Sequence, residues 1–214
     1  PKGVQLPHRC LSNLIGWQLK NSNCGIGDCT LQYASNNFDA SFQETYATLT
    51  SGGTLCVVPE EARQDFSKLG ALIREESPQR IYLPFVALDM LAQLFSGNTD
   101  ELSIKEVIAA GEQLKITPAI RELFSGLDGA VLANHYGPTE THVVTTYTLE
   151  GDANTWPGLP SIGRPISNAN IYIVDHSLQP VPIGVAGEIL VGGVPVARGY
   201  LNHSEQTNQS FIPS

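Results

Sequence analysis

Five short apolar segments that alternate with helix-like stretches constrain the fold of this chain more than any other feature. They are TLQYAS, TLCVVP, RIYLP, IKEVIAAG and AVLANHYG, which begin at Thr30, Thr54, Arg80, Ile104 and Ala130. Their apolar character is continuous rather than alternating, which is typical of parallel strands covered on both faces. Helices are expected over residues 6–21, 41–53, 65–76, 84–97 and 117–126. The sequence therefore predicts an α/β fold with a mostly parallel β-sheet layered with helices.

The pattern changes after about residue 140. The segments VVTTYTLEG, NANIYIVD and GEILVGG are rich in residues that favour strands, and Pro/Gly loops separate them. We therefore expect two parts: an α/β layer over residues 1–140, and a small β-rich, barrel-like unit over residues 141–214.

Composition narrows the class of protein. Of 214 residues 42% are hydrophobic, enough for one sizeable core or two small ones. The chain has 12 basic and 21 acidic residues, which argues against nucleic acid as a partner because phosphate backbones need clustered Lys and Arg. Its apolar runs are far shorter than the roughly 20 residues of a membrane span, and no signal peptide is recognisable. We expect a cytoplasmic protein without a membrane partner.

The four cysteines do not have the spacing of a zinc site. Cys10, Cys24, Cys29 and Cys56 are expected to be reduced thiols, some of them partly buried. A disulfide between Cys24 and Cys29, which lie close together in the sequence, is the alternative.

Polar side chains gather where three of the predicted strands end. The stretches are ASNNFDAS at 34–41, AAGEQL at 109–114 and NHYGPTETH at 134–142. In open α/β sheets the ligand crevice lies outside the carboxyl ends of the strands. The three stretches therefore predict one shared ligand crevice at that edge of the sheet.

Four motifs in this order resemble the adenylation domains of nonribosomal peptide synthetases, within the adenylate-forming superfamily. They are FDASFQE, AAGEQL, NHYGPTET and GEILVGGVPVARGYL, which begin at Phe38, Ala109, Asn134 and Gly187. The opening PKG resembles the end of that family's phosphate loop. The rest of that loop, the ribose-binding Asp and the small C-terminal domain with its catalytic Lys have no counterpart here. We therefore expect a central fragment of the large N-terminal subdomain, truncated at both ends.

The resemblance implies an activity. A member of the family uses ATP and Mg²⁺ to activate an amino acid as an aminoacyl-adenylate. The activated amino acid then passes to the phosphopantetheine thiol of a peptidyl carrier protein, and condensation domains of the same synthetase are further partners. Such a reaction depends on positioning the reactants and neutralising charge, because the ionised carboxylate attacks without losing a proton.

The resemblance also assigns the nucleotide side of the site. Thr139 and Glu140 are the expected catalytic residues; the hydroxyl would bond the α-phosphate and the carboxylate would help hold Mg²⁺. The expected contacts to ATP come from Gly111, Glu112, Asn134, Tyr136, Gly137 and Thr139. Simpler structural roles remain open: a helix-start Glu favoured by the helix dipole, an N-cap hydroxyl and a core tyrosine.

For the amino acid, Asp39 resembles the residue that grips the substrate's α-ammonium group, and an Asx turn is its structural alternative. The family's specificity positions correspond to Asp39, Ala40, Gln43, Tyr82, Ile108, Ala110, His135, Val143 and Val144. This set resembles that of proline-activating domains, with Ala40 and Tyr82 as departures. We expect proline or an analogue such as methylproline, hydroxyproline or pipecolate. His135 is expected to form part of the pocket wall rather than to act as a base.

Two other functions remain open at this stage. An acyl- or aryl-CoA synthetase of the same superfamily is one alternative, and Asp39 argues against it because an acid without an α-ammonium group needs no buried carboxylate there. The other is a binding fragment without catalytic competence, expected because the phosphate-loop glycines and the catalytic Lys have no counterpart here.

Overall fold

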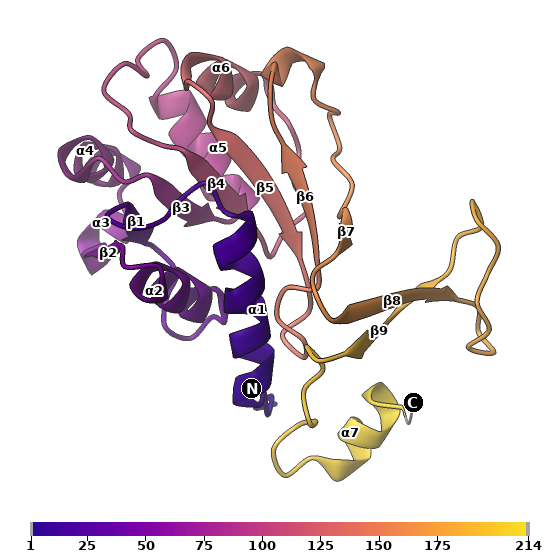
Figure 1. Ribbon diagram of the computed structural model, residues 1–214. Helices are drawn as coiled ribbons and strands as arrows, with labels where there is room; N and C mark the ends of the chain where they lie inside the picture. Colours follow the sequence, from indigo (N-terminus) through magenta and orange to yellow (C-terminus); the bar gives the residue numbers. More distant parts are fainter. Residues whose placement is uncertain (1, 213–214) are drawn as a thin grey trace.

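The computed structural model describes residues 2–212 and centres on one twisted seven-stranded sheet (Figure 1). Its strand order is β2-β1-β3-β4-β5-β6-β7. Neighbouring strands from β2 to β5 run parallel, whereas β6 and β7 continue the sheet antiparallel. The strands are β1 Cys29–Gln32, β2 Thr54–Val57, β3 Arg80–Leu83, β4 Glu106–Ala109, β5 Val131–Tyr136, β6 Thr145–Leu149 and β7 Arg164–Pro165. The predicted mostly parallel α/β fold is confirmed.

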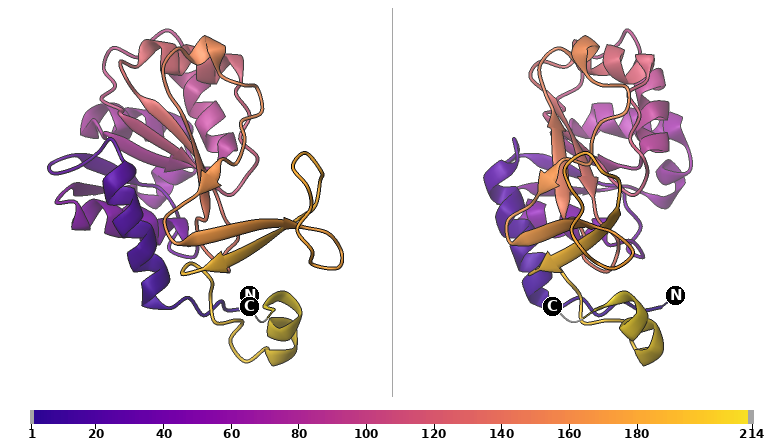
Figure 2. Two further views of the ribbon diagram at one scale, coloured as in Figure 1. Left: turned by 45° about the vertical axis from the view of Figure 1, so that its right-hand side comes forward. Right: turned by 90° about the vertical axis from the view of Figure 1, so that its right-hand side faces the viewer.

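Helices cover both faces of the sheet, which the edge-on view of Figure 2 shows. One face carries α1 and α2, which contact each other, and the opposite face carries a row formed by α3 to α6. The helices are α1 His8–Asn21, α2 Ala40–Thr50, α3 Glu60–Arg63, α4 Phe66–Glu76, α5 Phe85–Leu94 and α6 Pro118–Gly126. Local signals set their starts: the Asp65 carboxylate accepts from Ser67 N and Lys68 N, and Thr117 caps α6 just before Pro118.

The main core lies between the sheet and α4, α5 and α6. Alternate strand residues, among them Leu31, Ile81, Val107 and Leu132, point into it. The residues between them, represented by Ile108, point to the α1 and α2 face, because successive side chains of a strand lie on opposite faces. Burial on both faces explains why these strands read as continuous apolar runs.

The region after residue 140 differs from the expected barrel-like unit. β6 returns antiparallel beside β5 and buries Leu149 in the main core, so it belongs to the main sheet. β8 (Ala169–Val174) and β9 (Glu188–Gly193) form a separate two-stranded antiparallel sheet, which stands apart in Figure 1. The sequence pattern also gave no signal for η1 (Ala153–Thr155) or α7 (Ser204–Ser210).

A buried ion pair holds the amino ends of two central strands together. Arg80 Nε lies 2.8 Å from Glu106 Oε2, and the two side chains are 2% and 6% exposed. The guanidinium also donates to Ser22 Oγ at 2.6 Å and to the Cys24 carbonyl at 3.3 Å. Ser22 Oγ in turn donates to the Glu106 carboxylate. The charges are thus matched by a network of hydrogen bonds, as buried charges require.

The thiols are free, as expected, at Cys10, Cys24, Cys29 and Cys56. None of the helices in residues 2–212 has the length and apolar character that crossing a bilayer requires.

Candidate amino-acid and nucleotide site

Strand register brings the predicted pocket residues into two rows on the α1 and α2 face. Tyr82 pairs with Ile108, and Ile108 pairs with Ala133, so that these three side chains form a buried cluster. Ala110 follows Ile108 by two positions, and His135 follows Ala133 by two. Both therefore face the same side of the sheet as Ile108 and Ala133. The expected proximity of Tyr82, Ile108, Ala110 and His135 thus follows directly from the parallel pairing.

A buried chain of side-chain amides connects this face of the sheet to the two helices above it. Gln43 on α2 donates from Nε2 to Gln18 Oε1 on α1, at 2.8 Å. Gln18 Nε2 donates in turn to the Tyr82 hydroxyl. Gln43 Nε2 also lies 3.3 Å from His135 Nδ1. Gln18, Gln43 and Tyr82 are each less than 5% exposed, so these bonds form away from water and are correspondingly strong.

His135 is an uncharged part of this arrangement. Burial lowers the pKa of its imidazole to about 3, and neighbouring His142 acts in the same direction. At neutral pH the ring is therefore neutral, and it accepts from Gln43 at Nδ1. The Trp17 indole approaches it edge-on, with ring centroids 5.7 Å apart. A neutral imidazole held on both sides suits a pocket wall.

The loop after β5 folds back tightly on itself. A Cβ at Gly137 would lie 1.7 Å from the His142 carbonyl oxygen, so only glycine permits this approach. His142 has the left-handed φ of 57° and is 7% exposed. Its Nδ1 accepts from Val143 N at 2.9 Å, which leaves Nε2 to donate to the Asp39 carbonyl at 3.0 Å. His142 therefore joins the loop that carries Glu140 to the start of α2.

Asp39 stands at the N-cap position of α2, yet its carboxylate makes no capping hydrogen bond. The backbone carbonyl is used instead, accepting from Phe42 N and His142 Nε2. Asp39 and the neighbouring Ala40 are both half-buried. The carboxylate is close enough to His142 to oppose the lowering of the pKa of that imidazole by burial. The Asx-turn alternative is thus not what the carboxylate does here, and the carboxylate has no capping role at the start of α2.

Glu44, one turn further along α2, holds the loop that precedes Asp39. Its carboxylate accepts from Tyr33 N at 3.1 Å, from Ala34 N at 3.0 Å and from Gln32 Nε2 at 3.2 Å. The side chain is fully buried, and burial raises the pKa of the carboxyl group to about 7 despite these donors. Glu44 therefore positions the loop rather than binding a ligand.

Glu140 meets a residue from the far end of the chain. The Tyr200 hydroxyl donates to Glu140 Oε1, Ala197 N donates to the Glu140 carbonyl at 2.9 Å, and the Lys2 ammonium lies 4.8 Å from the Tyr200 ring centroid. Mg²⁺ in nucleotide sites is usually held by one or two carboxylates together with substrate phosphates. The partly exposed Glu140 carboxylate fits that donor set. Over residues 2–212 no three His, Cys, Asp or Glu side chains gather into a ready-made metal cage.

The other residues expected to contact ATP are spread along the opposite side of β5 and in two loops. Asn134 is 5% exposed, and its Nδ2 donates to the Ser161 carbonyl at 2.9 Å. Tyr136 is half-buried and Thr139 is exposed. Gly111 has a φ of +85° with open space around it, and the neighbouring Glu112 carboxylate accepts from Val86 N at the start of α5. Glu112 and Asn134 thus have structural hydrogen bonds of their own.

Val143 and Val144 complete the expected pocket set from the β5–β6 connection. Both are buried, and both pack in an apolar cluster that includes Leu14 of α1. They contribute apolar surface between α1 and the sheet, and their role as pocket walls stays a prediction.

Four residues that contact the predicted set were absent from the sequence prediction: Trp17, Gln18, His142 and Tyr200. Gln18 did carry a signal, because it follows Leu14 by four positions and therefore lies on the buried face of α1. A glutamine on an apolar helix face needs a polar partner. Tyr200 lay inside the recognised motif GEILVGGVPVARGYL, but its contact with Glu140 depends on the fold.

Comparison with known proteins agrees with this geometry. The family model described as AMP-binding enzyme matches residues 1–201. The chain is 39% identical to gramicidin S synthase 2 of Brevibacillus brevis, over 99% of this chain and 5% of that protein. It is also 39% identical to tyrocidine synthase 2 of Brevibacillus parabrevis, over 99% of this chain and 6% of that protein.

Two solved structures share the fold. The nonribosomal peptide synthetase FmoA3 (S1046A) superimposes with a TM-score of 0.89 at 26% identity, over 98% of this chain and 23% of that one. The four-domain synthetase holo-AB3403, solved with AMP and glycine, gives a TM-score of 0.85 at 26% identity, over 99% and 15%. The chain spans only a small part of all these relatives. Since the family model covers nearly the whole sequence, this chain belongs to the AMP-binding enzyme family and is similar to the adenylation regions of nonribosomal peptide synthetases.

Proposed function

We propose that these residues form the amino-acid-binding core of an adenylating ligase in nonribosomal peptide synthesis. The observation that carries the proposal is the Asp39 carboxylate, which makes no capping hydrogen bond and belongs to a residue joined through His142 to the loop of Glu140. An amino acid would enter with its α-ammonium group on Asp39, and the attraction between opposite charges would offset the cost of removing both from water.

The pocket chemistry supports proline or a proline analogue as the substrate. The residues assigned to the walls are apolar or neutral, since Ile108, Val143 and Val144 are buried hydrocarbon and His135 has a pKa of about 3. The Tyr82 hydroxyl is buried and accepts a hydrogen bond from Gln18 Nε2. A compact aliphatic ring suits such walls. Proline-activating domains commonly carry Val at the position of Ala40. The smaller Ala40 side chain leaves room for a substituent on the ring.

On the other side of the site, Glu140 and Thr139 would face the triphosphate. A Mg²⁺ ion held by the Glu140 carboxylate would neutralise negative charge on the phosphates. Thr139 is exposed and free to donate its hydroxyl to the α-phosphate, while the Tyr200 hydroxyl keeps the Glu140 carboxylate in place. Tyr136 would provide a flat ring for adenine.

The relatives carry the matching region within longer chains, and the same is proposed here. The aminoacyl-adenylate would pass to the phosphopantetheine thiol of a peptidyl carrier domain, with condensation domains using the product. The resemblance to multidomain synthetases supports these partners.

The decisive experiment is ATP–pyrophosphate exchange by the full-length synthetase that contains these residues. The amino-acid panel should include proline, 4-methylproline, 4-hydroxyproline and pipecolate, with simple carboxylic acids as a control. We expect exchange with a proline-type amino acid and its loss in Asp39→Ala. Exchange stimulated by acids without an α-ammonium group, or unaltered in Asp39→Ala, would contradict the proposal and favour an acyl-CoA or aryl-CoA synthetase.

A further inference from the structure

We propose that Gln18 of α1 is a specificity-determining positioning residue for the amino-acid pocket. This inference rests on the proposed function and adds a residue that the resemblance does not assign. Gln18 holds Gln43 and Tyr82 in place and, together with His135, also lines a cavity between α1 and strands β5 and β6.

The hydrogen bonds of the Gln18 side chain lead to pocket residues. Its Oε1 accepts from Gln43 and its Nε2 donates to Tyr82, so one amide fixes two side chains that belong to different elements, α2 and β3. Gln18 is 2% exposed, and its neighbour Trp17 contacts His135 edge-on. One turn of α1 therefore contacts three of the expected specificity residues. Without those bonds Gln43 and Tyr82 would be buried polar groups free to rotate.

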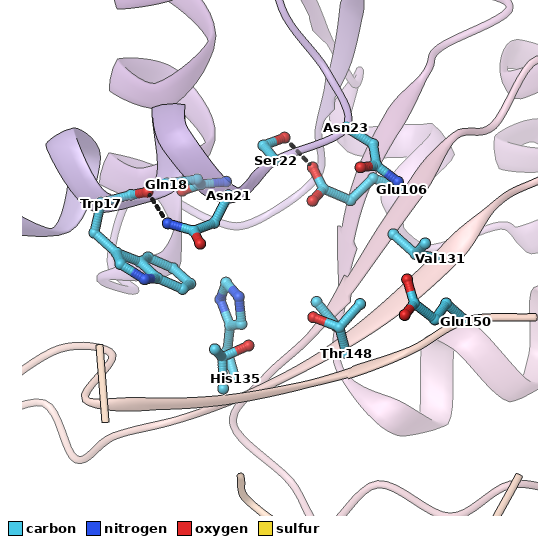
Figure 3. A pocket seen from close by; sticks show the side chains of 12 residues that line it. Trp17, Gln18, Asn21, Ser22, Asn23, Glu106, Val131, His135, Thr148 and Glu150 are labelled. Atoms are coloured by element: carbon cyan, nitrogen blue, oxygen red, sulfur yellow. Dashed lines mark hydrogen bonds between the residues drawn. The ribbon is translucent and has the colours of Figure 1, made fainter. Parts of the chain in front are cut away.

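A cavity with a volume of about 230 Å³ lies between the end of α1 and strands β5 and β6 (Figure 3). Trp17, Gln18, Asn21, Ala133, His135 and Thr148 are among its lining residues. Gln43, Tyr82 and Ile108 do not line it. Within residues 2–212, Gln18 and His135 alone both line the cavity and bond to Gln43, so these two side chains connect the cavity to Gln43. Figure 3 shows the His135 ring standing on the strand below and pointing toward Trp17.

This geometry makes Gln18 control substrate size in two ways. A residue of similar size that cannot form the hydrogen bonds of Gln18 would leave the Gln43 and Tyr82 side chains free to move. The enzyme would then select less strongly for its preferred amino acid. Removing its bulk would extend the cavity that Gln18 lines toward Gln43 and Tyr82, and so leave space for a longer side chain. Small differences in pocket volume change selectivity by about 10-fold to 200-fold per methylene-sized group.

The test measures kcat/KM in pyrophosphate exchange with the full-length synthetase, for proline and for the larger phenylalanine. We expect Gln18→Leu to lower kcat/KM for proline about tenfold or more while the KM for ATP stays within about twofold. In Gln18→Ala the ratio of phenylalanine to proline activity should rise at least tenfold. Asn21→Ala is the matched control, because Asn21 lines the same cavity from the same helix but its side chain bonds to the Trp17 carbonyl. It should keep the wild-type ratio.

A double variant protects the test against simple misfolding. In Gln18→Leu/Tyr82→Phe the hydroxyl left without its partner is also removed, so proline activity should recover toward that of Tyr82→Phe alone. Wild-type substrate ratios in both Gln18 variants, or a double variant no better than Gln18→Leu, would overturn the role of Gln18. The proposed function would survive that result. It fails separately if the wild-type enzyme shows no amino-acid-dependent exchange.

Discussion

The two ends of the parallel sheet use polar groups in opposite ways. At the amino ends, Arg80 and Glu106 are buried and each charge is matched by hydrogen bonds within 2.6 to 3.3 Å. At the carboxyl ends, Asp39 carries a charge that caps nothing, and Thr139 stands exposed. The first end uses its polar atoms to hold the fold, whereas the second keeps some of them free. Both ends carry charged residues, so charge alone does not tell a structural cluster from a candidate site. Whether the polar side chains already have hydrogen-bond partners within the protein tells them apart more clearly.

The largest expected effect on stability is at the amino end. Glu106→Ala leaves the Arg80 guanidinium buried without its counter-charge, and such a change costs about 3–5 kcal/mol in the free energy of unfolding. Urea unfolding followed by circular dichroism measures this. Glu101→Ala is the matched control, because it removes an exposed partner of Arg74 and should cost no more than about 1 kcal/mol. If the two variants lost the same free energy of unfolding, the buried ion pair would contribute no more to stability than the exposed one.

A smaller loss is expected from the tight loop at the carboxyl end. In Gly137→Ala the new methyl group meets the His142 carbonyl, so the backbone must shift, at a cost of about 1–3 kcal/mol. Because His142 also bonds to Asp39, amino-acid activation by the full-length enzyme should fall as well. Gly158→Ala serves as the control, since a methyl group there meets nothing within 4 Å. An unaltered unfolding midpoint in Gly137→Ala would contradict the close approach.

Stability should also depend on pH through Glu44. Its folded-state pKa of about 7 lies above the ordinary value of 4.5, so its contribution is fully present below pH 4.5 and is lost as pH rises toward 7. The slope is at most about 1.4 kcal/mol per pH unit. Glu44→Gln keeps an acceptor for Tyr33 N and Ala34 N but cannot ionise. The wild-type and variant profiles should diverge between pH 4.5 and 7; parallel profiles would rule out the raised pKa.

The smallest effect on stability is expected where the functional effect is largest. An N-cap aspartate normally contributes about 0.5–2 kcal/mol, but the Asp39 carboxylate caps nothing, so Asp39→Ala should alter unfolding by no more than about 0.5 kcal/mol. Asp65→Ala provides the contrast, because that carboxylate accepts from Ser67 N and Lys68 N and its loss should cost about 1 kcal/mol. A larger loss in Asp39→Ala than in Asp65→Ala would assign Asp39 to the fold.

Sequence reasoning predicted the parallel sheet because continuous apolar runs are a local pattern. The choice of Tyr82, Ile108 and His135 came from the family resemblance, and the strand register now explains why they lie on one face. Sequence reasoning missed that β6 joins the main sheet, since an antiparallel return looks the same whether it extends the old sheet or starts a new one. It also missed Gln18 and Tyr200. Their partners lie 64 and 60 positions away in the sequence, and no local propensity encodes such a meeting.

The register of the central strands has an evolutionary consequence. Ile108 faces the pocket and Val107 faces the main core, because neighbours on a strand point in opposite directions. One inserted residue in β4 would exchange these two roles and damage core and pocket together. Point substitution leaves the backbone order untouched. A lineage with this architecture can therefore acquire a new substrate by exchanging side chains at fixed sites, while insertions and deletions within its strands are eliminated by selection.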